Sequence, residues 1–261
     1  MKKQMNSPRR FHPFTISAAM TTFLPGKRVS NLFTLIQLFS VIILLQPFHS
    51  VNAQPLDPHE VDRNTAVLLH FDDEEGEIAL DATENGFDMN LENGADWELP
   101  GWDNTPSAAD LTAGAARINS NHIVGNNWDA ITIEAFIFAT VINNEHPIVY
   151  RMEWHNVADP SFYIALHSRG EVSAGVYANQ PGSDNSGVVS EPGIIEAGQW
   201  YHVAMTWSSG QPTRIYVDGD LIATSNQVVE GTVRAGNDPL RIGCGWQGRY
   251  VWLYFQGFID E

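Results

Sequence analysis

The sequence has a single cysteine and few basic residues. With Cys244 alone, no internal disulfide can form, so an exported fold would have to be stabilised by its core or by a metal. We expect Cys244 to be a small buried hydrophobic residue. After residue 53 there is no lysine, and eight arginines stand against 31 acidic residues. This balance disfavours nucleic acid and anionic membranes as partners, because phosphates are bound by clustered Lys and Arg.

The common catalytic motifs are also missing. The chain contains no His-Glu-x-x-His, no Gly-x-Ser-x-Gly and no glycine-rich phosphate loop. The Glu-x-Asp-x-x-Glu pattern of paired carboxylates used in glycoside hydrolysis is not found either: Ala79 precedes Asp81 where a nucleophile would stand, and Glu134 has no carboxylate two residues away. His146 and His155 lie among acidic residues; a metal site is one interpretation, and we expect instead that both are solvated surface residues. The sequence therefore predicts a protein that is not an enzyme.

Residues 1–53 have the pattern of an export signal. Basic residues come first, Leu32–Leu45 is apolar, and Val51-Asn52-Ala53 supplies small residues for cleavage before Gln54. A signal anchor is the alternative, but the apolar run is shorter than the roughly 20 residues that span a bilayer. Cleavage would remove six basic residues and no acidic one, which takes the formal net charge from −17 to −23. We predict a secreted, extracellular protein, or part of a larger cell-surface protein.

Residues 54–64 are polar, contain two prolines and predict a linker before one domain over 65–261. This domain has no helical apolar stripe. It has short stretches in which apolar and polar residues alternate, separated by turn-forming residues. Many short strands of this kind predict an all-β fold, a two-sheet antiparallel β-sandwich. The predicted strands are Ala66–Phe71, Phe87–Leu91, Ala113–Ile118, Ile131–Val141, Ile148–Met152, Phe162–His167, Val172–Tyr177, Trp200–Trp207, Arg214–Asp218, Asp220–Ser225, Pro239–Ile242 and Tyr250–Phe258.

The clearest local signal is Asp218-Gly219, between two alternating stretches. A type I′ turn needs positive φ at both central positions, which Asp-Gly accepts. Together with Trp200-Tyr-His-Val-Ala204 before it and Leu221 after it, this hairpin resembles the central hairpin of the laminin-G-like, or concanavalin A-like, jelly roll. Further matching segments occur in the same order along the chain: Leu69–Asp72, Asp81–Gly86, Ile131–Phe136 and Gly257–Glu261. In the family, residues equivalent to Gly257–Glu261 are followed by more strand residues, so we expect this domain to be truncated at its C-terminus.

The resemblance implies a non-catalytic recognition module that binds carbohydrate, a lectin-like function. A protein-binding or adhesion module of a larger surface protein is the alternative that the same fold serves. A glycoside hydrolase is a third: laminarinase-type relatives use Glu-x-Asp-x-x-Glu on one strand, and this pattern is absent here.

The resemblance also implies a structural calcium where the first strand, the acidic loop after it and the closing strand meet. On this sequence it points to Asp72, Asp81 and Asp260, with a carbonyl near Gly257. Calcium prefers six to eight oxygen ligands. The alternative is an ordinary solvated acidic loop.

For a sugar site the sequence offers an aromatic row. Tyr250, Trp252 and Tyr254 alternate with apolar residues, and Trp246 stands just before them. If this face lies on a concave sheet, it is a platform for the C–H faces of a sugar; if it faces the other sheet, it is core. In the second case the loop Asn179–Pro192 is the remaining candidate.

Overall fold

The computed structural model describes residues 59–261, except for 115, 116, 121, 123, 152–160, 180–184 and 248–250, and at 246, 247, 251 and 252 it describes the backbone alone. These residues lie within one compact unit, Asn52–Glu261. The predicted signal peptide and the first part of the predicted linker lie outside them. The regular elements of the described part are strands and one short 3-10 turn, η1 (Trp102–Asn104), which confirms the all-β prediction. Within it, no helix is long and apolar enough to cross a membrane.

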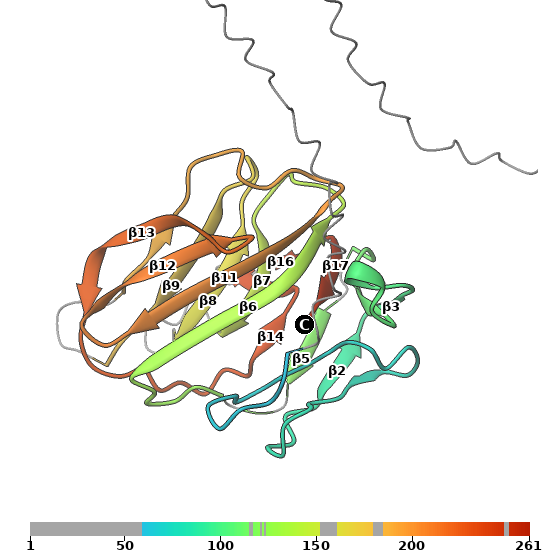
Figure 1. The fold of residues 1–261 in the computed structure, drawn as a ribbon, viewed down its shortest axis with the longest axis horizontal. Helices are drawn as coiled ribbons and strands as arrows, with labels where there is room; N and C mark the ends of the chain where they lie inside the picture. Colours follow the sequence, from blue (N-terminus) through green and yellow to red (C-terminus); the bar gives the residue numbers. More distant parts are fainter. Residues whose placement is uncertain are drawn as a thin grey trace, which may run out of the picture. The chain divides into compact units, whose positions relative to one another are not determined.

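Two antiparallel sheets pack face to face (Figure 1). The eight-stranded sheet has the order β1 (Ile78–Ala79), β2 (Met89–Glu92), β5 (Arg117–Ser120), β14 (Arg241–Ile242), β7 (His146–Arg151), β8 (Phe162–Leu166), β9 (Val172–Val176) and β10 (Val188–Val189). The seven-stranded sheet has the order β13 (Asp220–Val229), β12 (Gln211–Val217), β11 (Trp200–Ser208), β6 (Ala130–Ala139), β17 (Gly257–Asp260), β4 (Ala108–Asp110) and β3 (Asp96–Glu98).

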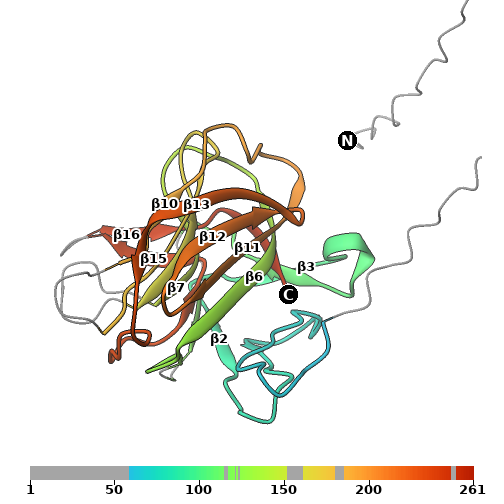
Figure 2. The same ribbon diagram turned by 60° about the vertical axis from the view of Figure 1, so that its left-hand side comes forward.

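A third, two-stranded sheet joins β15 (Cys244–Gln247) to β16 (Val251–Tyr254). It lies beside β7, as Figure 2 shows, and the backbone at Gly245 approaches Tyr150 so closely that a Cβ there would lie 3.3 Å from the Tyr150 ring. This hairpin is therefore an addition to one side of the sandwich and not a strand of either main sheet.

Alternation along β6 and β11 decides which residues form the core. Ile137, Val203 and Met205 are fully buried and pack with residues of the opposite sheet, such as Ile148 and Ile164. The residues between them on β6 and β11 point to the other face of the seven-stranded sheet, because successive side chains of a strand point to opposite faces. This outer face carries the site described below.

The predicted turn between β12 and β13 is confirmed. Asp218 has φ 50° and Gly219 has φ 84°, and Val217 pairs directly with Asp220. Positive φ at both central residues is the type I′ geometry, whose twist matches that of the flanking strands.

Several strand boundaries differ from the prediction, among them those of Ala66–Phe71 and Tyr250–Phe258. Ala66–Phe71 forms no continuous strand, and Leu69 makes only an isolated bridge to Asp81. The predicted strand Tyr250–Phe258 is divided between β16 and β17. The break is at Phe255 and Gln256, and the next residue, Gly257, has φ 156° and lies against β6: a Cβ there would be 1.9 Å from the carbonyl oxygen of Phe138. Only glycine allows this approach.

Two single-residue expectations have opposite outcomes. Cys244 is fully buried, as predicted, and burial raises the pKa of its thiol to about 12. His146 is not a surface residue: it is 2% exposed on β7, and its Nδ1 lies 3.2 Å from the carbonyl oxygen of Tyr254. The neighbouring acidic residues suggested a loop, whereas strand pairing and the added hairpin cover this histidine. His155 lies outside the described residues.

Candidate functional site

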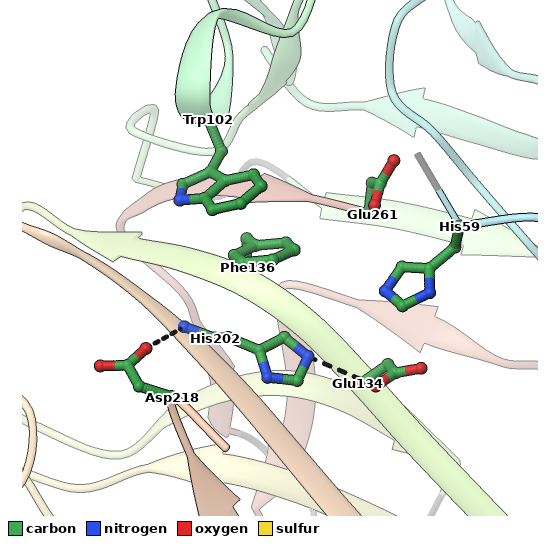
Figure 3. A pocket seen from close by; sticks show the side chains of 7 residues that line it. All are labelled: His59, Trp102, Glu134, Phe136, His202, Asp218 and Glu261. Carbon is green, nitrogen blue, oxygen red and sulfur yellow. Dashed lines mark hydrogen bonds and ion pairs between the residues drawn. The ribbon is translucent and has the colours of Figure 1, made fainter. Parts of the chain in front are cut away.

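A pocket of about 380 Å³ opens on the outer face of the seven-stranded sheet (Figure 3). Some of its lining residues lie on β6 and β11, between residues that form the core. The other lining residues lie in loops or at the two ends of the described chain. The lining residues are His59, Trp102, Glu134, Phe136, His202, Asp218 and Glu261.

An aromatic stack forms one side of the pocket. The rings of Trp102 and Phe136 lie nearly parallel, with centroids 3.7 Å apart and an interplanar angle of 16°. The imidazole of His202 lies below Phe136 in Figure 3, with ring centroids 4.9 Å apart and the ring planes tilted by 50°. Phe136 is almost completely covered, whereas Trp102 and His202 stay half-buried and give the pocket its aromatic surface.

Asp260 positions Trp102. Its Oδ2 accepts a hydrogen bond from the backbone N–H of Trp102 (2.8 Å) and another from the Thr105 hydroxyl (2.7 Å), so β17 fixes both ends of the η1 turn. Asp260 is fully buried. Burial raises the pKa of its carboxyl to about 6, although the hydrogen bonds from Thr105 and Trp102 act in the opposite direction.

The polar side of the pocket is built on β6, β11 and the β12–β13 turn. His202 Nε2 lies 3.3 Å from Glu134 Oε2. The backbone N–H of His202 donates to Asp218 Oδ1 at 2.9 Å, and the N–H of Asp218 donates back to the His202 carbonyl at 2.9 Å. The His202 hydrogen bond lowers the pKa of Glu134, against the opposing effect of burial. Glu134 is therefore an ionised acceptor at neutral pH.

The two ends of the described chain complete the pocket. His59 approaches Glu134 from a segment without regular structure, and Glu261 follows β17 (Figure 3). Glu261 Oε1 lies 3.2 Å from Nδ1 of His70, which fixes the carboxylate beside the first segment. Three carboxylates and two imidazoles therefore surround one aromatic stack, and the arrangement can accept hydrogen bonds from a ligand whose apolar face contacts the rings.

A second aromatic group extends the same face of the sheet. Phe138 follows Phe136 by two residues on β6 and pairs with Trp200 on one side and Phe258 on the other. The ring centroids are 5.6 Å apart for Phe138 and Trp200 and 5.4 Å apart for Phe138 and Phe258. All three are half-buried, so the outer face offers apolar ring surface beyond the pocket itself.

Of the four sugar-binding residues predicted from the sequence, the structure describes the side chain of Tyr254 alone. Trp246 and Trp252 are cross-strand partners in the β15–β16 hairpin, where only their backbone is described, and Tyr250 lies outside the described residues. Tyr254 is half-buried and pairs with Cys244. Tyr254, whose side chain is described, is not among the residues that line the pocket. Of the alternative loop Asn179–Pro192, residues 180–184 lie outside the described part.

The predicted calcium ligands are engaged differently. Both oxygens of Asp81 accept hydrogen bonds: Oδ1 from the N–H groups of Leu68 and Thr83, Oδ2 from the Thr83 hydroxyl and the N–H of Phe87. Asp260 accepts from the donors described above, and Asp72 is exposed. Calcium is bound by oxygen atoms that are free to coordinate it. The carboxylate oxygens of Asp81 and Asp260 instead accept hydrogen bonds from N–H and O–H groups, and these bonds account for the position of both carboxylates without a metal. Calcium at these residues stays a prediction.

Sequence reasoning missed most of the pocket. Glu134 has no second carboxylate at strand spacing, His202 lies within an alternating strand pattern, and His59 falls in the predicted linker. Trp102 lies in a stretch that carries only loop signals. One signal was available: Glu134 and Phe136 share the outward face of a strand whose other face is apolar. An aromatic residue next to a carboxylate on the outward face of a strand indicates a candidate binding surface, because a face that is only solvated is typically polar.

These features define a β-sandwich with an aromatic and acidic pocket on the outer face of one sheet. The model of the concanavalin A-like lectin/glucanases superfamily that is called Laminin_G_3 matches residues 112–261, more than half of the chain. The chain belongs to this family, which confirms the resemblance seen in its sequence. A search of curated proteins found no match.

Solved structures with the same fold are distant in sequence. Domain 4 of AbnA, an extracellular GH43 arabinanase from Geobacillus stearothermophilus, in complex with arabinotriose, is 16% identical, with a TM-score of 0.52 over 74% of this chain and 87% of that domain. The binding domain of Paraclostridial Mosquitocidal Protein 1 is 14% identical, with a TM-score of 0.52 over 71% of this chain. The chain spans only 45% of that toxin domain. These similarities support a jelly-roll sandwich and say nothing of individual site residues.

Proposed function

We propose that this chain is a secreted, non-catalytic recognition module that binds carbohydrate in the pocket around Trp102. The observation that carries the proposal is the stack of Trp102 on Phe136 beside the carboxylates of Glu134, Asp218 and Glu261. The pocket volume of about 380 Å³ lies at the lower end of the range, about 300–1,000 Å³, of small-molecule sites. It suits one or two sugar rings better than a long chain.

The chemistry of a sugar matches both sides of this pocket. The C–H face of a pyranose or furanose ring is apolar and flat, so it packs on the exposed surface of Trp102. Its hydroxyl groups donate hydrogen bonds, and an ionised carboxylate such as Glu134 is a strong acceptor. The arabinotriose in the complex of the arabinanase domain supports a carbohydrate ligand as a class, without indicating which glycan binds here.

Several features of the carboxylates favour binding over hydrolysis. A glycosidase needs one carboxylic acid that stays protonated, with a raised pKa, opposite a second carboxylate. The pKa of Glu134 is lowered by His202. Asp218 is held by the backbone N–H of His202 as part of the turn. We therefore expect no release of reducing ends from β-glucan, arabinan or galactan above a buffer blank. Release by homogeneous wild-type protein that Glu134→Gln abolishes would show that these carboxylates catalyse.

A protein-binding or adhesion module is the second candidate. It is favoured by exposed apolar side chains on the neighbouring edge strands β10 and β13: Val189 is 57% exposed, Leu221 53% and Val228 52%. Exposed apolar side chains on edge strands offer a surface for contact with another protein.

A glycan array probed with the full chain separates the two candidates. Binding to a defined glycan set, including arabino-oligosaccharides, supports the first candidate. Absence of binding to every glycan, both with and without divalent cations, contradicts it. In that case Leu221→Asp, which alters the edge and leaves the pocket intact, becomes the variant to compare in partner capture from extracellular extracts.

A further inference from the structure

Three side chains of the pocket bring metal-ligand atoms together. One ligand atom each of His59, Glu134 and His202 lies within 4.8 Å of the other two, and in the described part of the chain no other three His, Cys, Asp or Glu residues do so. The three come from separate segments: His59 precedes the first strand, Glu134 lies on β6 and His202 on β11. Nothing in the sequence spacing indicates this group.

The donor set selects the kind of metal. Two imidazole nitrogens and one carboxylate oxygen suit zinc and similar transition metals, whereas calcium prefers oxygen ligands alone. In a tetrahedral zinc site with bonds of about 2.0–2.1 Å, neighbouring ligand atoms lie about 3.3 Å apart. His202 Nε2 and Glu134 Oε2 are already 3.3 Å apart. Bringing His59 to the same spacing requires only an adjustment of an exposed side chain in an irregular segment.

The fold holds two of the ligands in place. Glu134 on β6 pairs with Ala204 on β11. Because His202 is two residues from Ala204 on the same strand, the side chains of Glu134 and His202 lie on the same face of the sheet. The backbone of His202 is fixed further by its two hydrogen bonds with Asp218, and its ring is flanked by Phe136. Such support from surrounding residues is what orients histidine ligands in metal sites.

We propose that His59, Glu134 and His202 form a binding site for Zn²⁺ or a similar divalent transition metal. Three protein ligands leave a fourth position of a tetrahedral site for water or for a ligand group in the pocket. The metal would connect the segment before the first strand to β6 and β11. This site is distinct from the calcium predicted at Asp72, Asp81 and Asp260, and it stands whether or not the pocket binds a sugar.

The test is a titration of ZnCl₂ alone into the full chain, expressed without a polyhistidine tag and freed of metal. We expect one Zn²⁺ per chain by calorimetry and a rise in Tm, since a metal that binds only the native state stabilises it. His59→Ala should weaken binding by at least tenfold. His59 is exposed and outside regular structure, so this change leaves the fold intact. His122→Ala, which removes an exposed histidine outside the pocket, should bind zinc like the wild type.

Two further measurements assign the other ligands and separate this proposal from the proposed function. Glu134→Gln should also lose zinc affinity, and Ca²⁺ should not compete with Zn²⁺ at equal concentration. Absence of zinc binding by the wild type, or equal binding by His59→Ala and His122→Ala, overturns the site. Glycan binding measured in metal-free protein is independent of these results, so the carbohydrate proposal fails only if the array itself is negative.

Discussion

Replacing Trp102 by alanine tests the pocket most directly. The change removes the ring that stacks on Phe136 at 3.7 Å and opens one wall of the cavity. A stacked aromatic contact is worth about 0.5–1.5 kcal/mol beyond the area that it buries. If the same ring holds a sugar, Trp102→Ala should lower affinity by about tenfold, since 1.4 kcal/mol is one factor of ten.

The same substitution should cost only moderate stability. Trp102 is half-buried and lies in a turn, so the loss should be about 1–2 kcal/mol, well below the roughly 3–5 kcal/mol of a core tryptophan. For a domain of this size, that corresponds to a fall in Tm of about 2–8 °C. The protein therefore remains folded at the temperature of the binding assay, and lost affinity reports on the pocket.

The assay is calorimetric titration with the best glycan from the array, beside a thermal melt of each variant. Trp97→Ala is the matched control: Trp97 is also half-buried, lies on β3 and donates its indole N–H to the carbonyl of Gly76, away from the pocket. It should lose stability and keep affinity, and Trp102→Phe should recover part of the binding. Glycan affinity that is unchanged in Trp102→Ala would refute the proposal that this pocket binds the sugar.

Two further predictions concern Asp260 and calcium. Burial raises the pKa of Asp260 from 3.8 to about 6, so its contribution to the free energy of unfolding is present below pH 3.8 and is lost as pH rises through 6. The free energy of unfolding from urea melts, compared between the wild type and Asp260→Asn, should therefore differ by an amount that changes by roughly 3 kcal/mol between pH 3.5 and 7.5. A difference that stays constant over this pH range contradicts the pKa shift. If calcium binds at Asp72, Asp81 and Asp260, Ca²⁺ at a hundred times its Kd should stabilise metal-free protein by about 2.7 kcal/mol, in His59→Ala as well as in the wild type. An identical melt with and without Ca²⁺ removes that site.

The fold could be predicted from the sequence because its signals are local. Alternation in Ile131–Val141 and Trp200–Trp207 predicted strands that the structure has as β6 and β11. The Asp218-Gly219 turn followed from the backbone preferences of two residues. Period-2 alternation with an apolar face can be satisfied only by burying that face, so the sequence already implied a sandwich. Short strands such as β4, with three residues, carry too little pattern to be recognised.

The pocket was decided by tertiary structure. Trp102 reaches Phe136 only because Asp260, far away in sequence, fixes the turn that carries it. His59 and His202 come together because strand pairing brings β11 next to β6, while His59 lies beside Glu134 on the same face. Trp246, Trp252 and Tyr254 from the predicted aromatic row belong to a separate hairpin. The periodicity of a sequence shows which face of a strand is buried. The pairing of strands that are distant in the sequence decides which outward side chains come together, and a binding site depends on this pairing.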